Sequence, residues 1–219
     1  MKNSAGEGNR LINQEQAYCT QEIFSLAGKD KRSTGINGLD QTLEGGFPVG
    51  TCIVVMGSPL SGLDQMARQF WKVNGEEGTY LMVDGEVESG MADGRGIPLD
   101  QLPRMCQGER VVIDSISSII LTHGIDEAIR TMIAIRKEMA SRNANVLFTF
   151  YADLHAPLEQ IMVMRTAEVF VELKEVIFMN EIERQLAIHK LKGAAVPRRL
   201  VPFLITEKGI ELSTTSRVV

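Results

Sequence analysis

The fold can be inferred from one stretch of sequence, Gly50-Thr-Cys-Ile-Val-Val-Met-Gly57-Ser-Pro-Leu-Ser-Gly62-Leu63-Asp64. Its residues 52–56 are apolar and mostly β-branched, and the run has the length of a buried strand. A loop bounded by glycines follows, and residues 65–73 then have the apolar spacing of a helix. Strand, tight loop and helix are the context in which proteins bind phosphate, because backbone N–H groups and a helix N-terminus converge on the anion.

The loop departs from the P-loop pattern, which is Gly, four residues, Gly, Lys and then Ser or Thr. Gly57 and Gly62 have the required spacing, but Leu63 stands in the lysine position and Asp64 in the hydroxyl position. In a P-loop the lysine neutralises the β- and γ-phosphates and the hydroxyl holds magnesium. Two glycines at this spacing are also compatible with an ordinary tight turn. The candidate nucleotide-binding residues are Gly57, Ser58, Pro59, Leu60, Ser61, Gly62, Leu63 and Asp64.

ATP with Mg²⁺ is the cofactor that this loop suggests, and the two replacements argue against its binding. Leu63 supplies no positive charge, and Asp64 places a carboxylate near the expected phosphates. A carboxylate could hold magnesium, but a missing cation and an added anion both weaken the binding of a triphosphate. The loop therefore predicts a P-loop scaffold that has lost its phosphate chemistry.

The composition limits the class of protein. A chain of 219 residues suits one α/β domain with a substantial core. The net charge of −5 argues against general attraction to nucleic acid. The 3 cysteines are few and scattered, which favours reduced thiols and a cytoplasmic setting. No apolar run has the length of a membrane span, and the polar N-terminus does not resemble a signal peptide.

Residues 33–50 carry the most specific motif of the chain, Thr34-Gly-Ile-Asn-Gly38-Leu-Asp40 followed by Leu43-Glu-Gly-Gly46. This segment resembles the opening of KaiC-type and RadA-type members of the RecA-like ATPase superfamily, and the resemblance continues to about residue 212. It implies an α/β fold with a RecA-like P-loop NTPase core: a mostly parallel central sheet flanked by helices, with C-terminal antiparallel strands and hairpins.

The resemblance also suggests the domain organisation. We expect one KaiC/RecA-like domain over residues 33–214 and a tail over residues 215–219. Residues 1–32 are expected to form an N-terminal extension that is partly disordered or contains a short helix around residues 14–26.

Acids follow two predicted strands downstream of the loop. In KaiC-like proteins a pair of adjacent glutamates ends the strand predicted over residues 78–83, and one of them activates the attacking water. Asp84 matches the first of the pair and Gly85 replaces the second, so Asp84 and Glu86 are candidate general bases. The alternative is solvated loop charge. The next strand, Arg110–Asp114, resembles Walker B, which makes Asp114 the candidate metal residue or, alternatively, a hydrogen-bond partner of the loop.

The segment between these strands is short. Residues 89–109 are rich in Gly and Pro, whereas the family usually has a helix, a strand and another helix in this interval. We therefore expect part of the sheet to be missing or replaced by a loop. A helix over residues 126–142 and a strand over residues 145–151 follow, and His155 beyond that strand is either a loop residue or a sensor of the γ-phosphate.

The C-terminal third reads as strands joined by hairpins, over residues 166–173, 176–178, 184–191, 200–205 and 209–212. The run Leu186-Ala-Ile-His-Lys190-Leu-Lys192-Gly193 resembles the family motif Val-x-Lys-x-Arg-Gly-Ser, whose two cations reach the γ-phosphate of the neighbouring subunit. The resemblance implies that Lys190 and Lys192 act in trans. The alternative is a basic strand edge that discourages unwanted pairing.

Three functions remain open at this point, and enzymatic activity is uncertain but not favoured. The leading hypothesis is a non-catalytic or weakly nucleotide-binding regulatory or assembly subunit, in a homo-oligomer or with an active KaiC/RecA-like ATPase. The second is an active ATPase in which another cation replaces the lysine. The third is a single-stranded DNA-binding accessory protein similar to recombinase relatives, which the net charge and the single Trp71 support little.

Overall fold

The structure is a computed structural model, and it describes residues 31–73 and 76–212. These residues belong to a compact unit that begins at Lys31. The predicted helix around residues 14–26 and the predicted tail over residues 215–219 lie outside the described residues.

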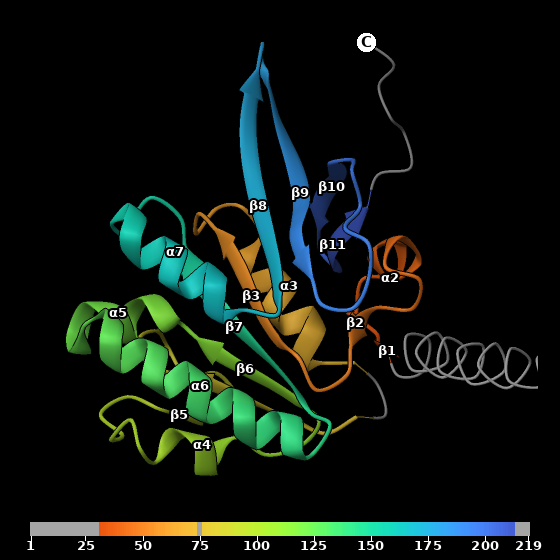
Figure 1. The fold of residues 1–219 in the computed structure, drawn as a ribbon. Helices are drawn as coiled ribbons and strands as arrows, with labels where there is room; N and C mark the ends of the chain where they lie inside the picture. The colour runs from red at the N-terminus through yellow and green to blue at the C-terminus, as the bar shows by residue number, and fades with distance from the viewer. Residues whose placement is uncertain (1–30, 74–75, 213–219) are drawn as a thin grey trace, which may run out of the picture. The chain divides into compact units, whose positions relative to one another are not determined.

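The described part of the chain contains a sheet of nine strands in the order β11-β10-β9-β8-β3-β7-β6-β4-β5 (Figure 1). The parallel strands are β3 (Cys52–Gly57), β4 (Gly78–Met82), β5 (Ala92–Asp93), β6 (Arg110–Asp114), β7 (Asn145–Tyr151) and β8 (Val169–Phe178). The antiparallel strands are β9 (Glu181–Leu191), β10 (Val201–Thr206) and β11 (Gly209–Leu212). The predicted mostly parallel sheet with C-terminal antiparallel strands is therefore confirmed. A second, small sheet pairs β1 (Lys31–Arg32) with β2 (Phe47–Pro48).

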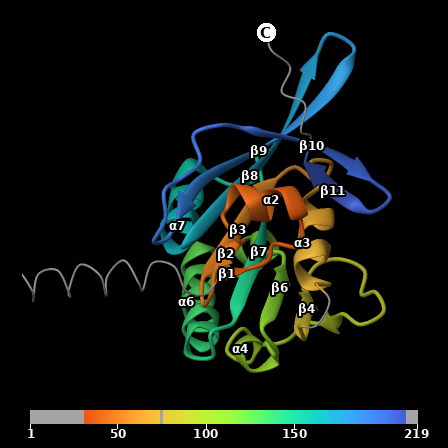
Figure 2. The same ribbon diagram turned by 90° about the vertical axis from the view of Figure 1, so that its right-hand side faces the viewer.

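Helices cover both faces of the large sheet (Figures 1 and 2). One face packs against α2 (Asn37–Thr42) and α3 (Leu63–Trp71). The other face packs against α4 (Leu102–Met105), α5 (Ile116–His123), α6 (Ile125–Ser141) and α7 (Pro157–Thr166). No helix within the described residues is both long and apolar enough to cross a lipid bilayer.

Strand β3 lies between the two cores. Ile53 and Val55 pack in the core that contains α3, whereas Cys52 and Val54 pack in the core that contains α6. A continuous apolar run is what a parallel strand with both faces covered requires. The strand that carries the loop is thus fixed from both sides.

Several predicted boundaries differ from the structure by a few residues. The helix after the loop begins at Leu63 and not at residue 65, because Gly62 adopts φ 95° and the helix starts directly after it. The expected break in the hairpin near residue 174 is absent, because β8 pairs with β9 along the whole of Val169–Phe178. Residues 166–168 precede β8 and do not belong to it.

The segment 89–109 keeps more of the sheet than we expected. Its two-residue strand β5 pairs in parallel with β4 through Leu81–Ala92 and Met82–Asp93, and α4 follows. The expectation of a missing piece is therefore wrong as to the strand, which is present at the edge but short. The Gly- and Pro-rich composition limits its length.

The C-terminal hairpin is anchored to α3. The side-chain oxygen of Gln69 accepts a hydrogen bond of 2.6 Å from the backbone N–H of Ile210, and its amide nitrogen donates one of 3.1 Å to the Ile210 carbonyl. Side chains of Ile205 and Ile210 also come close to Gly62. The helix after the loop is therefore held between the sheet and the β10–β11 hairpin.

The Thr-Gly-x-x-Gly-Leu-Asp motif folds around its aspartate. Asp40 accepts hydrogen bonds from the Ser33 hydroxyl at 2.5 Å and from the backbone N–H and the hydroxyl of Thr34, each at 2.6 Å. The carboxylate thus closes the segment between β1 and α2, which explains why the motif ends in an acid.

Candidate functional site

The loop between β3 and α3 is held in a tight conformation by contacts among its own residues. A Cβ on Gly57 would lie 2.3 Å from the Ser61 hydroxyl oxygen, so only glycine fits at this position. The Ser61 hydroxyl donates a hydrogen bond of 2.7 Å to the Ser58 carbonyl, and the Ser61 side chain is buried. Pro59 and Leu60 form the exposed part of the loop. A serine hydroxyl thus fills space inside the loop.

The two replaced P-loop positions have different surroundings. Leu63 is 0% exposed and packs in the core with Met66 and Phe70. Asp64 is half-buried, and burial raises the pKa of its carboxyl, with a further contribution from the charge of Asp114. The first position is therefore part of the core, and the second brings a poorly solvated carboxylate to the start of α3.

A charged pair that was not predicted from the sequence lies at the edge of the loop. The Ser58 hydroxyl donates a hydrogen bond of 3.0 Å to Oε2 of Glu175, and Arg184 lies 3.1 Å from Oε1 of the same carboxylate. Glu175 and Arg184 face each other across β8 and β9. The sequence indicated an ion pair only through the opposite charges of these residues on two strands of a predicted hairpin. The register that places them opposite each other could not be predicted from the sequence.

Asp114, the candidate metal residue, is buried at the end of β6. Its Oδ2 accepts a hydrogen bond of 2.5 Å from the Tyr80 hydroxyl, and its Oδ1 accepts one of 2.5 Å from the Thr149 hydroxyl. Burial raises the pKa of this carboxyl, whereas the two hydrogen bonds act in the opposite direction. Tyr80 and Thr149 were not predicted; a hydroxyl within the otherwise apolar run of β7 was the signal for Thr149.

Asp84 and Glu86 are both exposed on the loop after β4, and Asp84 lies beside the start of α5. The Ser115 hydroxyl donates a hydrogen bond of 2.7 Å to Asp84, and the Ser118 hydroxyl donates another to the same oxygen. Ser115 is also the N-cap of α5. Asp84 therefore has two partners within the chain, and it lies next to the end of β6, the strand that pairs with β4.

The three aspartates act on one another electrostatically. Burial and the charges of Asp84, Asp114 and Asp64 together raise the pKa of the nearby Tyr151 hydroxyl to about 12. The structure thus brings the predicted acids into one region at the carboxyl ends of the strands. In the part of the chain that the structure describes, however, no group of three His, Cys, Asp or Glu side chains is arranged to hold a metal ion.

The two candidate trans-acting lysines have partners within the chain. Lys190 donates hydrogen bonds to the carbonyl oxygens of Met164 at 3.3 Å and Arg165 at 3.2 Å, and also to that of Ala167. These carbonyls form the C-terminal end of α7. Lys192 forms an ion pair of 2.5 Å with Glu168. A role in trans stays a prediction for both lysines.

Two comparisons with known proteins bear on the family and the fold of this chain. The family model of the KaiC ATPases matches residues 97–217, which is more than half of the chain. The chain belongs to the KaiC ATPase family. Among solved structures, the crystal structure of the KaiC-like protein PH0186 from the hyperthermophilic archaeon Pyrococcus horikoshii OT3 is similar, with a TM-score of 0.70 and 21% identity, covering 84% of this chain and 99% of that chain. No curated protein matches the chain.

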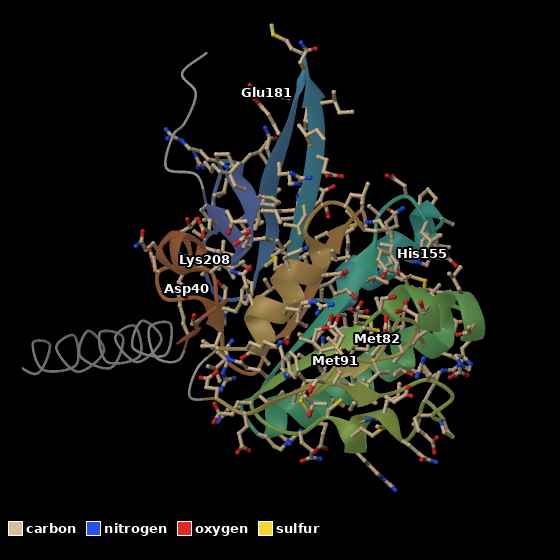
Figure 3. All side chains as sticks on the ribbon, turned by 180° about the vertical axis from the view of Figure 1, so that it is seen from behind. Asp40, Met82, Met91, His155, Glu181 and Lys208 are labelled. Carbon is tan, nitrogen blue, oxygen red and sulfur yellow. The ribbon has the colours of Figure 1, made fainter. Side chains whose placement is uncertain are left out.

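His155 of this KaiC-family chain is buried just before α7 (Figure 3). Its ring stacks on Phe150 with centroids 4.9 Å apart, and its Nδ1 lies 3.7 Å from Glu159. Burial lowers the pKa of the imidazole, and the Glu159 charge opposes this shift. Nε2 is buried and has no hydrogen-bond partner among the described residues. The sensor hypothesis for this residue stays untested.

Trp71 packs at the border of the core in this KaiC fold. Its ring stands edge-on to Tyr80 at 5.3 Å between centroids, and its Nε1 donates a hydrogen bond of 3.1 Å to the Gly78 carbonyl. The ring packs partly buried against the core that contains α3. These contacts do not favour Trp71 as an exposed platform for stacking nucleic-acid bases.

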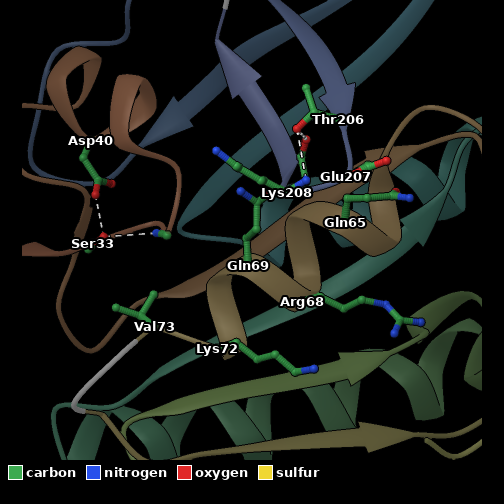
Figure 4. Close-up of a pocket in the computed structure, with 12 residues that line it drawn as sticks. Ser33, Asp40, Gln65, Arg68, Gln69, Lys72, Val73, Thr206, Glu207 and Lys208 are labelled. Atoms are coloured by element: carbon green, nitrogen blue, oxygen red, sulfur yellow. Dashed lines mark hydrogen bonds between the residues drawn. The ribbon is translucent and has the colours of Figure 1, made fainter.

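A cavity of about 830 Å³ lies along the outer side of α3 (Figure 4). It is lined by α3, by the turn between β10 and β11, by the segment before α2 and by Asp40 of α2; the lining includes Gln65, Arg68, Lys72 and Lys208. None of the candidate loop residues 57–64 lines it. A second cavity of about 490 Å³ borders Asp84 and Ser118 and is otherwise mainly aliphatic.

Proposed function

We propose that this KaiC-family chain is a regulatory or assembly subunit that does not itself turn over ATP. In this proposal it forms oligomers with itself or with an active KaiC-like ATPase. The observation that carries the proposal is the replacement of the P-loop lysine and hydroxyl by Leu63 and Asp64. The Leu63 side chain is part of the core, so no cation at this position neutralises a triphosphate.

The residues around the loop do not fit magnesium–ATP in the usual arrangement. Both carboxylate oxygens of Asp114 already accept hydrogen bonds, from Tyr80 and Thr149. Asp64 and Asp84 add negative charge in the same region. Two like charges about 4 Å apart repel by about 4 kcal/mol at the effective dielectric constant of a protein surface, and a triphosphate would add to that repulsion.

The end of the β8–β9 hairpin supports a role in assembly. The hairpin extends beyond the rest of the sheet (Figure 1), and Glu181 lies near its end (Figure 3). Ile177, Met179 and Ile182 are 80%, 84% and 58% exposed there. Exposed aliphatic side chains that gather in one place mark a surface that contacts another protein. In the assembled state, Lys190 and Lys192 are candidates to contact a neighbouring active site.

The first experiment measures ATP binding and hydrolysis by the purified full chain. Isothermal titration with ATP, with and without Mg²⁺, is expected to give a dissociation constant above the millimolar range and no turnover. An Asp114→Asn variant purified in the same way controls for a contaminating ATPase, because contaminating activity persists in that preparation. Hydrolysis by the wild type that this substitution abolishes contradicts the proposal.

The second experiment tests assembly. Light scattering after size-exclusion chromatography gives the mass of the wild type alone and mixed with an active KaiC-family ATPase from the same cell. We expect a mass above 24.2 kDa in at least one of these samples and a lower mass after Ile177→Ser together with Ile182→Ser. A wild type that stays monomeric in both samples overturns this part of the proposal.

A further inference from the structure

We propose that Ser58 and Arg184 form a binding site for a phosphate oxyanion at the edge of the loop, and that Glu175 occupies this site as a built-in ligand. The inference rests on the proposed function, because it concerns the same loop. It adds that Glu175 occupies the site, that Arg184 supplies the cation missing at position 63, and that removal of the Glu175 charge opens the site to an external anion.

The two oxygens of Glu175 have different partners. Oε2 accepts a hydrogen bond of 3.0 Å from the Ser58 hydroxyl, and Oε1 pairs with Arg184 at 3.1 Å. A carboxylate held between a hydroxyl of a phosphate-type loop and a guanidinium has the partners that a phosphate oxyanion would have. Glu175 therefore stands where an external anion would bind.

The register of the sheet fixes this placement. Glu175 lies directly opposite Arg184 in the β8–β9 pairing, so both side chains point to the same side of the hairpin. Two residues earlier, Leu173 approaches Gly57 so closely that a Cβ on the glycine would lie 3.2 Å from the leucine Cβ. Strand β8 thus runs along the loop and brings Glu175 to Ser58.

Arg184 has binding capacity that Glu175 does not use. Its Nε is buried and has no hydrogen-bond partner among the described residues. A guanidinium has five N–H donors in a planar fork that matches an oxyanion, and a buried donor without a partner calls for an explanation. A bound phosphate group would occupy that donor. The cation missing at position 63 is then supplied from β9 of the same chain.

Glu175 competes with an external anion at a high effective concentration, because both are directed to the same two groups and only Glu175 is attached to the fold. The site is therefore closed to phosphate in the wild type and opens when Glu175 is neutralised or removed.

The test is a titration of the full chain with inorganic diphosphate, with ATP and with adenosine. The variants are Glu175→Gln, which removes the charge, and Glu175→Ala, which also removes the side chain. Glu172→Gln is the matched control, because it removes one carboxylate from the same strand, where Glu172 pairs with Lys174 at 3.1 Å and with His189 at 2.7 Å. The reversal variant is Glu175→Ala combined with Arg184→Gln.

At least one of the two Glu175 variants is expected to bind diphosphate or ATP about tenfold more tightly than the wild type, which is about 1.4 kcal/mol. Adenosine is expected not to bind, and the gain is expected to disappear when Arg184→Gln is added. Equal affinity for diphosphate and ATP identifies the phosphate group alone as the ligand, and tighter binding of ATP extends the site to a nucleotide; both support the inference.

No gain in either Glu175 variant, an equal gain in Glu172→Gln, or a gain that survives Arg184→Gln overturns the inference. Circular dichroism and thermal melting confirm that each variant is folded. The two proposals fail separately: ATP hydrolysis by the wild type contradicts the proposed function, whereas failure of the Glu175 variants to bind anions leaves that function in place.

Discussion

The hydroxyl of Tyr80 donates a hydrogen bond of 2.5 Å to Oδ2 of Asp114, inside the sheet and next to the loop. The pair links β4 to β6, and Thr149 on β7 satisfies the second carboxylate oxygen. Three neighbouring strands therefore share one buried polar contact at their carboxyl ends.

Removal of the Tyr80 hydroxyl measures how much its hydrogen bond to Asp114 contributes to the free energy of unfolding. Tyr80→Phe is expected to lower the free energy of unfolding by about 1–3 kcal/mol, because it leaves a buried acceptor without one of its donors. Urea denaturation of Tyr80→Phe, Asp114→Asn and the double variant gives the coupling energy. Additive effects of the two substitutions would show that the hydrogen bond contributes little.

Asp64 is expected to destabilise the fold at neutral pH. Burial raises the native pKa of its carboxyl above the ordinary value for aspartate, so the native state binds more protons than the unfolded state, and stability is lost as pH rises through this range. Asp64→Asn should therefore melt at a higher temperature than the wild type at pH 7 and near the wild-type temperature at pH 3. The favourable interaction of an acid with a helix N-terminus acts the other way, and equal melting temperatures at pH 7 would mean that it balances the burial.

Asp93 provides the opposite case. Its hydrogen bonds with Arg95 lower the pKa of the Asp93 carboxyl to about 2, so its contribution is present above the unfolded pKa and is lost as pH falls toward 2. Asp93→Asn should lower the melting temperature slightly at pH 7. The melting temperature at pH 7 is thus expected to rise in Asp64→Asn and to fall in Asp93→Asn. Because both substitutions remove one negative charge, opposite changes show that the local surroundings of each aspartate cause them.

Because His155 is buried, we expect the free energy of unfolding to decrease in mild acid. Burial holds the native pKa of the His155 imidazole below the ordinary value of histidine, so the unfolded state binds more protons as pH falls below that ordinary value. The free energy of unfolding of the wild type is expected to fall between pH 7 and pH 5 more steeply than that of His155→Phe. Parallel pH profiles for the two proteins would rule out this contribution.

The two buried thiols are expected to be unreactive. Burial raises the pKa of Cys52 and of Cys106 to about 12, so almost no thiolate is present at pH 8. Alkylation of the native protein followed by peptide mapping should leave both cysteines unmodified, whereas both should react in denaturant. Rapid labelling of either one in the native protein would show that its core opens.

The lysine within β9, Lys190, and the lysine just after it, Lys192, are expected to differ in their structural importance. Lys190→Met removes the cation that binds the C-terminal carbonyls of α7 and should cost about 0.5–2 kcal/mol. Lys192→Met removes an exposed ion pair with Glu168 and should cost about 0–1 kcal/mol. Chemical denaturation distinguishes them, and a larger loss from Lys192→Met would reverse the assignment.

Local sequence patterns predicted the elements that lie in the middle of the sheet. Continuous apolar runs are typical of parallel strands that are buried on both faces of a sheet. This pattern occurs in Cys52–Gly57 and in the acid-terminated run of Arg110–Asp114. The family resemblance, carried by the motif around Asp40, added the mostly parallel sheet with antiparallel strands at its C-terminal side. Edge features were less certain, because the strand of Ala92–Asp93 pairs over too few residues to leave a hydrophobic pattern.

The contacts of the candidate site could be predicted only in part. The replaced positions 63 and 64 are visible in a motif of fixed spacing. The partners Tyr80 and Glu175 are not, because each depends on how two strands distant in sequence align. Lys190 shows the same limit: its position in a motif suggested a role between subunits, but its contact with the end of α7 depends on the fold of its own chain.

Because the Ile210 backbone N–H donates a hydrogen bond to the Gln69 side chain, exchange of this amide hydrogen reports on the contact between α3 and the β10–β11 hairpin. This hydrogen is held by a helix side chain and not by another strand, so exchange with deuterium at this amide measures whether the last hairpin stays docked. Titrating a ligand while following that single resonance would reveal whether events at the start of the helix reach the far edge of the sheet.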